Sequence, residues 1–240
     1  MTGFSQKFLG FMFAAHDLSL GFLVRNTGFL KVAILVSAHA SLLGIFFPDL
    51  RRSFGEVAGS LLIVILFLSP LVTITGMPLF RAAMGFRREF GILMGYLAIV
   101  HGAGYFLDPN YFDAFIMPHL GPDFFAMDPQ PLLGVIGIIL TFPLLLTSNA
   151  FALKNLGGKN WKWVHVLVYP MFVSVVLHRF SGGNEDGSLS GALEAFLLIG
   201  SYALLKYLAW KRGSFLSLRK QIDSITGRYK ESLLTKERDL

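Results

Sequence analysis

The chain has 240 residues, of which 54% are hydrophobic and only 15% charged, and its mean hydropathy is +0.60. A soluble domain carries roughly 25% charged residues and cannot bury so much apolar surface in one core, so the composition indicates an integral membrane protein in a lipid membrane. The net charge of +6 does not indicate a nucleic-acid partner here, because the cations lie beside apolar spans. Without cysteine, disulfides and iron–sulfur clusters are excluded, and any metal must bind nitrogen or oxygen.

Six stretches are long and apolar enough to cross a bilayer as helices, which takes about 20 residues each. They cover residues 28–47, 57–75, 90–107, 131–148, 163–180 and 189–210. We therefore predict an all-α, polytopic membrane protein, a six-transmembrane-helix bundle with no visible internal repeat. We expect residues 1–27 to form an amphipathic, interfacial N-terminal segment, with a signal peptide as the alternative, and residues 211–240 to form a basic amphipathic cytoplasmic tail helix.

Lys and Arg concentrate on the cytoplasmic side of membrane proteins, and their distribution orients this bundle. The second connection carries three arginines, the fourth carries three lysines, and the tail after Trp210 has eight cations against four acids. The third connection, residues 108–130, holds four aspartates and no Lys or Arg. Both termini are therefore predicted to be cytoplasmic and the third connection to face outward. The Arg51 and Arg52 pair, which falls on the outer side, is the exception.

Ionisable side chains inside membrane spans are costly, so each is a candidate functional group. Four histidines fall within the spans: His39, His101, His165 and His178. In the predicted topology His101 and His178 both lie in the outer half of the bundle. Imidazoles from two helices at one depth can bind a haem iron from both sides, which predicts a b-type haem site. Any one of these histidines taken alone could equally be hydrogen-bonded to a backbone carbonyl, and the sequence assigns no role to His39.

His165 lies 178 − 165 = 13 residues before His178. This is a rise of about 20 Å along a helix, so the two cannot bind the same iron, and on a straight helix their side chains point roughly 140° apart. Pro170, between them, removes a backbone donor and can rewind the helix locally. Arg87 and Arg88 at the inner end of the third span are first of all topology signals, but guanidinium groups also pair with haem propionates.

Several motifs together resemble the ferric reductase-like transmembrane family. They are Arg87-Arg88-Glu89-Phe90-Gly91, then Gly95-Tyr96 and His101, then Leu146-Thr147-Ser148, Trp161-Lys162-Trp163-Val164-His165 and Leu177-His178. The likeness is greatest to its short bacterial members, the haem-binding membrane subunit of the periplasmic methionine sulfoxide reductase system. The resemblance implies that residues 28–210 form a six-helix domain that holds one or two b haems, with His101, His165 and His178 as the haem histidines.

For function, the resemblance implies a haem b transmembrane electron-transfer protein, an oxidoreductase component of the bacterial inner (plasma) membrane. The donor would be a cytoplasmic flavin reductase or a quinol, and the acceptor a protein or a metal on the periplasmic or extracellular side. FMN is a further candidate cofactor. The chain has no Walker loop and no dinucleotide-binding glycine motif, so an external donor is expected. Longer members carry a further haem histidine where this chain has Arg87 and Arg88, so a second haem would lack the standard histidine pair.

Two other classes of protein compete with this interpretation. A transporter or channel without haem would use the histidines as a proton or ion relay, and a structural membrane subunit would have no redox role. Against the transporter, no pair of broken helices is evident, and Glu194 and Lys206 both lie near span ends. An optical spectrum separates the three classes, because only the first shows haem bands.

The charge asymmetry predicts the activity of reporter fusions. A reporter that works only outside the cytoplasm should be active after Asp123, in the third connection, and inactive after Leu240. The physical reason is that cations beside a span resist translocation. An active fusion at Leu240 would overturn the orientation and, with it, the cytoplasmic position of the donor.

Overall fold

The computed structural model describes residues 14–15, 17–181 and 189–238, with side chains described to residue 217 except at positions 115 and 189. These residues form helices and short connections, and no strand occurs among them. Most of the predicted N-terminal segment, including His16, lies outside the described residues, as does the connection 182–188 with its two acids.

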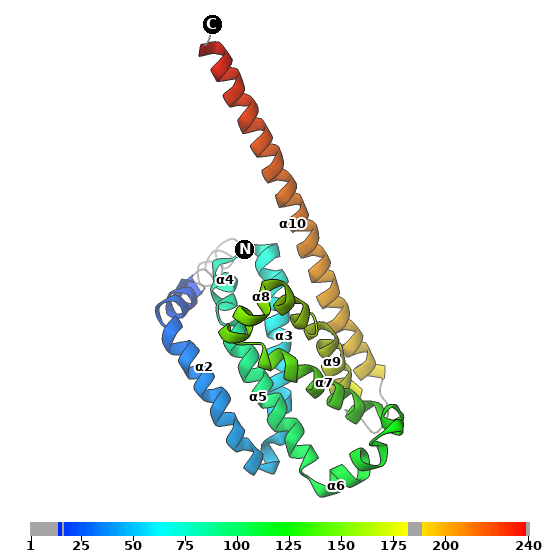
Figure 1. The fold of residues 1–240 in the computed structure, drawn as a ribbon. Helices are drawn as coiled ribbons and strands as arrows, with labels where there is room; N and C mark the ends of the chain where they lie inside the picture. The colour runs from blue at the N-terminus through cyan, green and yellow to red at the C-terminus, as the bar shows by residue number, and fades with distance from the viewer. Residues whose placement is uncertain (1–13, 16, 182–188, 239–240) are drawn as a thin grey trace, which may run out of the picture.

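Four helices form the centre of the bundle: α3 (Arg51–Thr75), α5 (Arg87–Phe106), α7 (Pro129–Leu146) and α9 (Val168–Ser181). Helix α3 packs along α5 and α7 packs along α9, while contacts of α5 with α7 and of α3 with α9 close the ring (Figure 1). The ring encloses an apolar core that includes Leu62, Leu66, Leu97, Leu144, Phe172 and Val176. Burial of these side chains holds the four helices together.

Two further helices cover the outside of this ring. Helix α2 (Thr27–Ser41), continued by η1 (Leu42–Phe46), packs on α5, and α10 (Leu189–Arg238) packs on α3 and α9. Only 11% of the apolar window in Thr27–Phe46 is buried within the protein, so most of that span is left to face lipid. The predicted tail, from residue 211 on, continues α10 as one helix of 50 residues that extends beyond the bundle (Figure 1).

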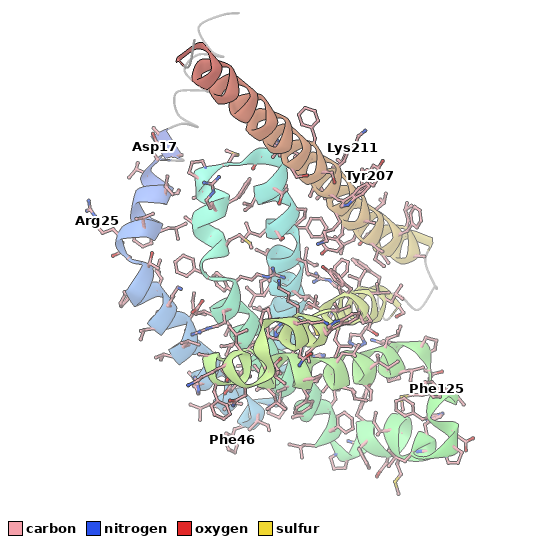
Figure 2. The ribbon with its side chains drawn as sticks, turned by 45° about the horizontal axis from the view of Figure 1, so that its top comes forward. Asp17, Arg25, Phe46, Phe125, Tyr207 and Lys211 are labelled. Atoms are coloured by element: carbon pink, nitrogen blue, oxygen red, sulfur yellow. The ribbon has the colours of Figure 1, made fainter. Side chains whose placement is uncertain are left out.

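The connections at the two ends of the bundle differ. At one end, α4 (Pro78–Met84) leads from α3 to α5, and α8 (Ala150–His165) leads from α7 to α9. At the other end, the third connection consists of four short helical segments: α6 (Pro109–Tyr111), η3 (Phe112–Ile116), η4 (Met117–His119) and η5 (Pro122–Ala126). A further short segment, η2 (Pro48–Leu50), precedes α3. Arg25 and Lys211 lie toward one end of the molecule and the apolar Phe46 and Phe125 toward the other (Figure 2). Which end is cytoplasmic stays a prediction.

Five helical stretches of the described residues are long and apolar enough to cross a membrane: Thr27–Phe46, Pro48–Thr75, Pro129–Leu146, Ala150–Ser181 and Ser190–Ser217. Helix α5 meets the same test together with Pro109–His119, from which it is bent by 75°, and this gives up to six spans. The prediction of an all-α, polytopic membrane protein is confirmed.

The predicted fifth span, 163–180, is not one regular helix. Helix α8 ends at His165 and α9 begins at Val168, and across this break Leu167 and Tyr169 donate their N–H groups to carbonyls three residues back instead of four. Pro170 has no N–H to donate, which leaves the carbonyl of its usual partner to this tighter turn.

The tighter turn changes the relative direction of the two histidines. Each residue in a 3₁₀ turn advances about 120° around the axis, against about 100° in an α-helix. The relative direction of His165 and His178 is therefore not the one that a straight helix would give. Pro170 was expected to be able to rewind the helix locally, and the hydrogen bonds of Leu167 and Tyr169 agree with this expectation.

Helix α3 ends at a glycine whose conformation an L side chain rarely adopts. Gly76 has a φ of 68° and donates its N–H to the carbonyl of Val72. We expect Gly76→Ala to lower the free energy of unfolding by about 1–2 kcal/mol, the cost of a left-handed residue, as measured by thermal unfolding in detergent. Gly28→Ala is the control, because a Cβ there meets nothing within 4 Å and alanine favours the helix. An equal loss in both variants would contradict the argument.

Candidate functional site

The half of the four-helix ring nearest the third connection contains a cavity of about 530 Å³, which we call the outer cavity after the predicted orientation. All four central helices line it, and among the lining residues are His101 of α5 and His178 of α9. The centres of the two imidazole rings are 6.2 Å apart and the ring planes are inclined by 72°. The structure thus brings together the two histidines that the sequence placed at one depth.

Each of these imidazoles is held by the first turn of the neighbouring helix. The Nδ1 of His101 lies 2.8 Å from the carbonyl oxygen of Arg51, at the start of α3, and the Nδ1 of His178 lies 2.8 Å from that of Gln130, at the start of α7. A carbonyl oxygen only accepts, so Nδ1 carries the proton in both rings. In the neutral imidazole Nε2 then keeps its lone pair, which is the state that binds a metal.

A glycine one helical turn further on makes room for each ring. A Cβ added at Gly55 would lie 2.5 Å from the His101 ring, and one added at Gly134 would lie 2.9 Å from the His178 ring. Both distances are shorter than real Cβ contacts allow. A larger residue at either position would therefore have to displace the imidazole or the helix.

These contacts form an arrangement that occurs twice in the chain. In each copy the residue that provides the first-turn carbonyl is followed four residues later by a glycine. The histidine bound to that carbonyl lies on the next central helix, and the carbonyl and histidine residues are 101 − 51 = 50 and 178 − 130 = 48 positions apart. The helix pairs α3–α5 and α7–α9 are the two copies. The sequence showed no repeat because the carbonyls come from different residue types, Arg51 and Gln130, and backbone contacts leave little trace in side chains.

The opposite half of the ring contains a second cavity, of about 620 Å³, which we call the inner cavity after the predicted orientation and which is lined by His165, Arg87 and Arg88. His165 stacks on Trp161, with ring centres 3.8 Å apart, and its Nε2 lies 3.2 Å from the hydroxyl of Thr147. Among the described residues that line this cavity, His165 is the one histidine. The structure therefore places the three remaining predicted site residues together, but without a second imidazole opposite His165.

A single layer of side chains separates the two cavities. One residue comes from each central helix, and all four line both cavities: Leu62, Met94, Thr141 and Met171. The Thr141 hydroxyl donates to the carbonyl of Gly137 and lies 3.2 Å from the sulfur of Met171. All four residues are buried. Two groups bound in the two cavities would therefore be separated by this one layer of side chains.

The arginines that broke the charge rule are neutralised by acids on the same side. Arg51 lies 2.8 Å from the Asp108 carboxylate, and Arg52 lies 3.1 Å from that of Glu56. The hydrogen bond from Arg51 holds the pKa of Asp108 below its ordinary value. The stabilisation by this pair is therefore complete above the ordinary aspartate pKa and is lost only as the pH falls through the lowered value.

Comparison with known proteins identifies the family. Residues 54–176 match the family described as "Ferric reductase like transmembrane component". The chain belongs to this family. The matched range contains His101 and His165, and His178 follows it by two residues. No solved structure matches the chain.

Curated relatives cover much of the chain. The chain is 32% identical over 153 residues to the "Protein-methionine-sulfoxide reductase heme-binding subunit MsrQ" of Brucella anthropi, covering 62% of this chain and 65% of that protein. It is 31% identical over 166 residues to the protein of the same name from Polaromonas naphthalenivorans, covering 68% of each. It is 26% identical over 166 residues to the "Magnetosome protein MamZ" of Magnetospirillum gryphiswaldense, covering 69% of this chain but only 24% of that protein.

Sequence reasoning missed several residues that shape the site of this family member. Gly55 and Gly134 carry no functional group, and a glycine facing a histidine could be found only with the helix pairing known. Glu89 is also buried, 3.8 Å from Lys31 and 3.5 Å from Arg88.

His39 lies apart from both cavities. Its Nδ1 is 2.7 Å from the carbonyl oxygen of Leu35, and its ring centre is 5.1 Å from that of Tyr96 on α5. It is absent from the described lining of either cavity. For each histidine taken alone, the sequence left open a hydrogen bond to a backbone carbonyl in place of a functional role. The contacts of His39 match that alternative.

The glycine contacts predict the effect of one added methyl group. Gly55→Ala should displace the His101 ring, disrupt its hydrogen bond to Arg51 and lower the free energy of unfolding by about 1–3 kcal/mol, the cost of overpacking. Thermal unfolding and the ¹⁵N chemical shifts of labelled histidine measure both effects. Gly59→Ala, one turn further along α3, is the matched control, because its Cβ would come no closer than 3.7 Å to any atom. Unchanged His101 shifts in Gly55→Ala would contradict the packing argument.

Proposed function

We propose that this protein is a haem b transmembrane electron-transfer subunit and that the outer cavity is its principal haem site. The supporting observation is the pair His101 and His178, which present two imidazoles in one cavity with Nδ1 bound to backbone carbonyls. Two Nε2 atoms that bind one metal at about 2 Å place the ring centres roughly 6 Å apart. The observed separation of 6.2 Å fits this requirement.

The donor set and the walls of the cavity fit haem. His101 and His178 would hold the iron, and a haem iron supplies one-electron chemistry at such a site. The apolar helices exclude water and so help to set the potential. Arg179 also lines the cavity and suits the carboxylates of a bound haem, because guanidinium groups pair well with carboxylates.

The inner cavity suits a second, anionic cofactor. Arg87 and Arg88 supply positive charge there, and His165 supplies one imidazole. The Nε2 of His165 already contacts the Thr147 hydroxyl, so binding a haem iron there would have to replace this contact, and His165 is the one histidine among the described residues that line this cavity. A second haem with a non-histidine ligand and FMN are the two candidates, and the layer of four side chains would let electrons pass between the cofactors over a short distance.

The direction of electron flow follows from the predicted orientation. With both termini cytoplasmic, the inner cavity faces the donor, for which we propose a flavin reductase or a quinol. The outer cavity then faces an acceptor beyond the membrane. The names of the MsrQ relatives favour a component of a methionine sulfoxide reductase system as that acceptor. The location that goes with this proposal is the bacterial inner membrane.

Replacing each histidine tests these assignments. His101→Ala and His178→Ala should each abolish or severely reduce haem binding in the outer cavity, because each removes one of the two imidazoles that would hold the iron. His165→Ala should remove at most part of the haem absorbance and leave the low-spin bis-histidine signal intact. Haem content of purified full-length protein and electron paramagnetic resonance spectra measure these outcomes.

The same experiment can refute the proposal. Wild-type protein without haem bands would exclude the haem function and leave the relay or structural interpretations. Full haem retention in both His101→Ala and His178→Ala would refute the outer site, whereas loss confined to His165→Ala would move the principal site to the inner cavity. His39→Ala is the matched control, since it removes a histidine from a span but from neither cavity.

A further inference from the structure

Arg51 contacts His101 through its backbone, while its side chain is anchored elsewhere. The carbonyl accepts from the imidazole Nδ1. The guanidinium Nη1 donates to the carboxylate of Asp108 at 2.8 Å and to the carbonyl of Gly104 at 3.0 Å, and the group lies over the ring of Tyr105, 5.1 Å from its centre. All three anchoring partners lie at the outer end of α5 or directly after it.

These contacts fasten the start of α3 to the end of the helix that carries His101. The backbones approach so closely that a Cβ added at Gly104 would lie 3.2 Å from the Cβ of Arg51. The side chains of Arg51 and Asp108 are only 24% and 25% exposed, whereas those of the neighbouring pair Arg52 and Glu56 are 85% and 57% exposed. The Arg51–Asp108 pair is therefore less screened by water and salt than an ordinary surface pair.

We propose that the Arg51–Asp108 ion pair is a positioning element for His101. It holds the Arg51 carbonyl against Nδ1 and thereby keeps Nε2 unprotonated and in one orientation within the outer cavity. This inference rests on the proposed function in that Nε2 of His101 is taken as an iron ligand. A hydrogen-bond partner of a metal-binding histidine sets its tautomer, orientation and basicity, so removal of the ion pair should be felt at the iron.

Two single variants and an exchanged pair test the proposal. Asp108→Asn and Arg51→Gln each break the ion pair while the backbone carbonyl of residue 51 remains. When haem is titrated into full-length apoprotein, each variant should bind it about tenfold more weakly than wild type. Oxidised samples should show a second low-spin signal in electron paramagnetic resonance, because the His101 ring is no longer held in one orientation. The double variant Arg51→Asp, Asp108→Arg re-forms the pair with its charges exchanged and should recover the affinity and the single signal.

Asp113→Asn is the matched control for the loss of charge. Asp113 is exposed and lies in the same connection, on η3, so this variant removes one negative charge from the same face and should bind haem as wild type does. Wild-type affinity and spectra in both broken-pair variants would overturn the proposal. Losses that the exchanged pair does not recover would also overturn it, because the ion pair itself would then not be the cause.

A failure of the proposed function is distinguished by a readout that needs no haem. Wild-type protein that binds no haem would refute the haem site but leave the positioning role open to measurement. In ¹⁵N spectra of histidine-labelled protein, His101 should be protonated at Nδ1 in wild type and show a mixture of tautomers in Asp108→Asn and Arg51→Gln. A single wild-type tautomer in both variants would overturn the positioning role whether or not haem binds.

Discussion

The hydrogen bond from a histidine Nδ1 to a backbone carbonyl in the first turn of the preceding central helix is the interaction on which the candidate site depends. A carbonyl in the first turn of α3 or α7 lies at the rim of the bundle, where the neighbouring imidazole can reach it. This bond decides which nitrogen carries the proton and, with the glycine one turn on, where the ring lies. Because the arrangement occurs in both helix pairs of the ring, two imidazoles meet in one cavity, each bound to a backbone carbonyl.

The bilayer imposes the second constraint, since charges placed at membrane depth must be neutralised or functional. Arg51 and Arg52 break the charge rule, and both are paired with acids on the same side of the bundle. Arg87 and Arg88 line the inner cavity, and Arg88 also approaches the buried Glu89. Arginine therefore serves in this chain as a topology signal, as an anchor between helices and as a source of positive charge in a cavity. The residues around each arginine determine which of these roles it has.

The two cavities lie one above the other because four helices surround one axis and a single layer of side chains crosses it. Leu62, Met94, Thr141 and Met171 form that layer, one from each helix, and their burial keeps the cavities separate but adjacent. The inner cavity has one histidine among its described lining residues and the outer one has two. This asymmetry explains why the two cavities suit different cofactors or different ligation.

The sequence by itself determined the membrane class, the apolar spans, the contrast between the two faces and the depth of His101 and His178, because hydropathy, charge and helical rise are properties of local sequence. It could not predict the break between α8 and α9, since the effect of Pro170 depends on which carbonyls its neighbours then bind. Nor could it find Gly55, Gly134 or the carbonyls of Arg51 and Gln130, because their role exists only between paired helices. Only the tertiary structure decided these contacts, since residues about fifty positions apart meet only when the helices pack, and no local pattern records that packing.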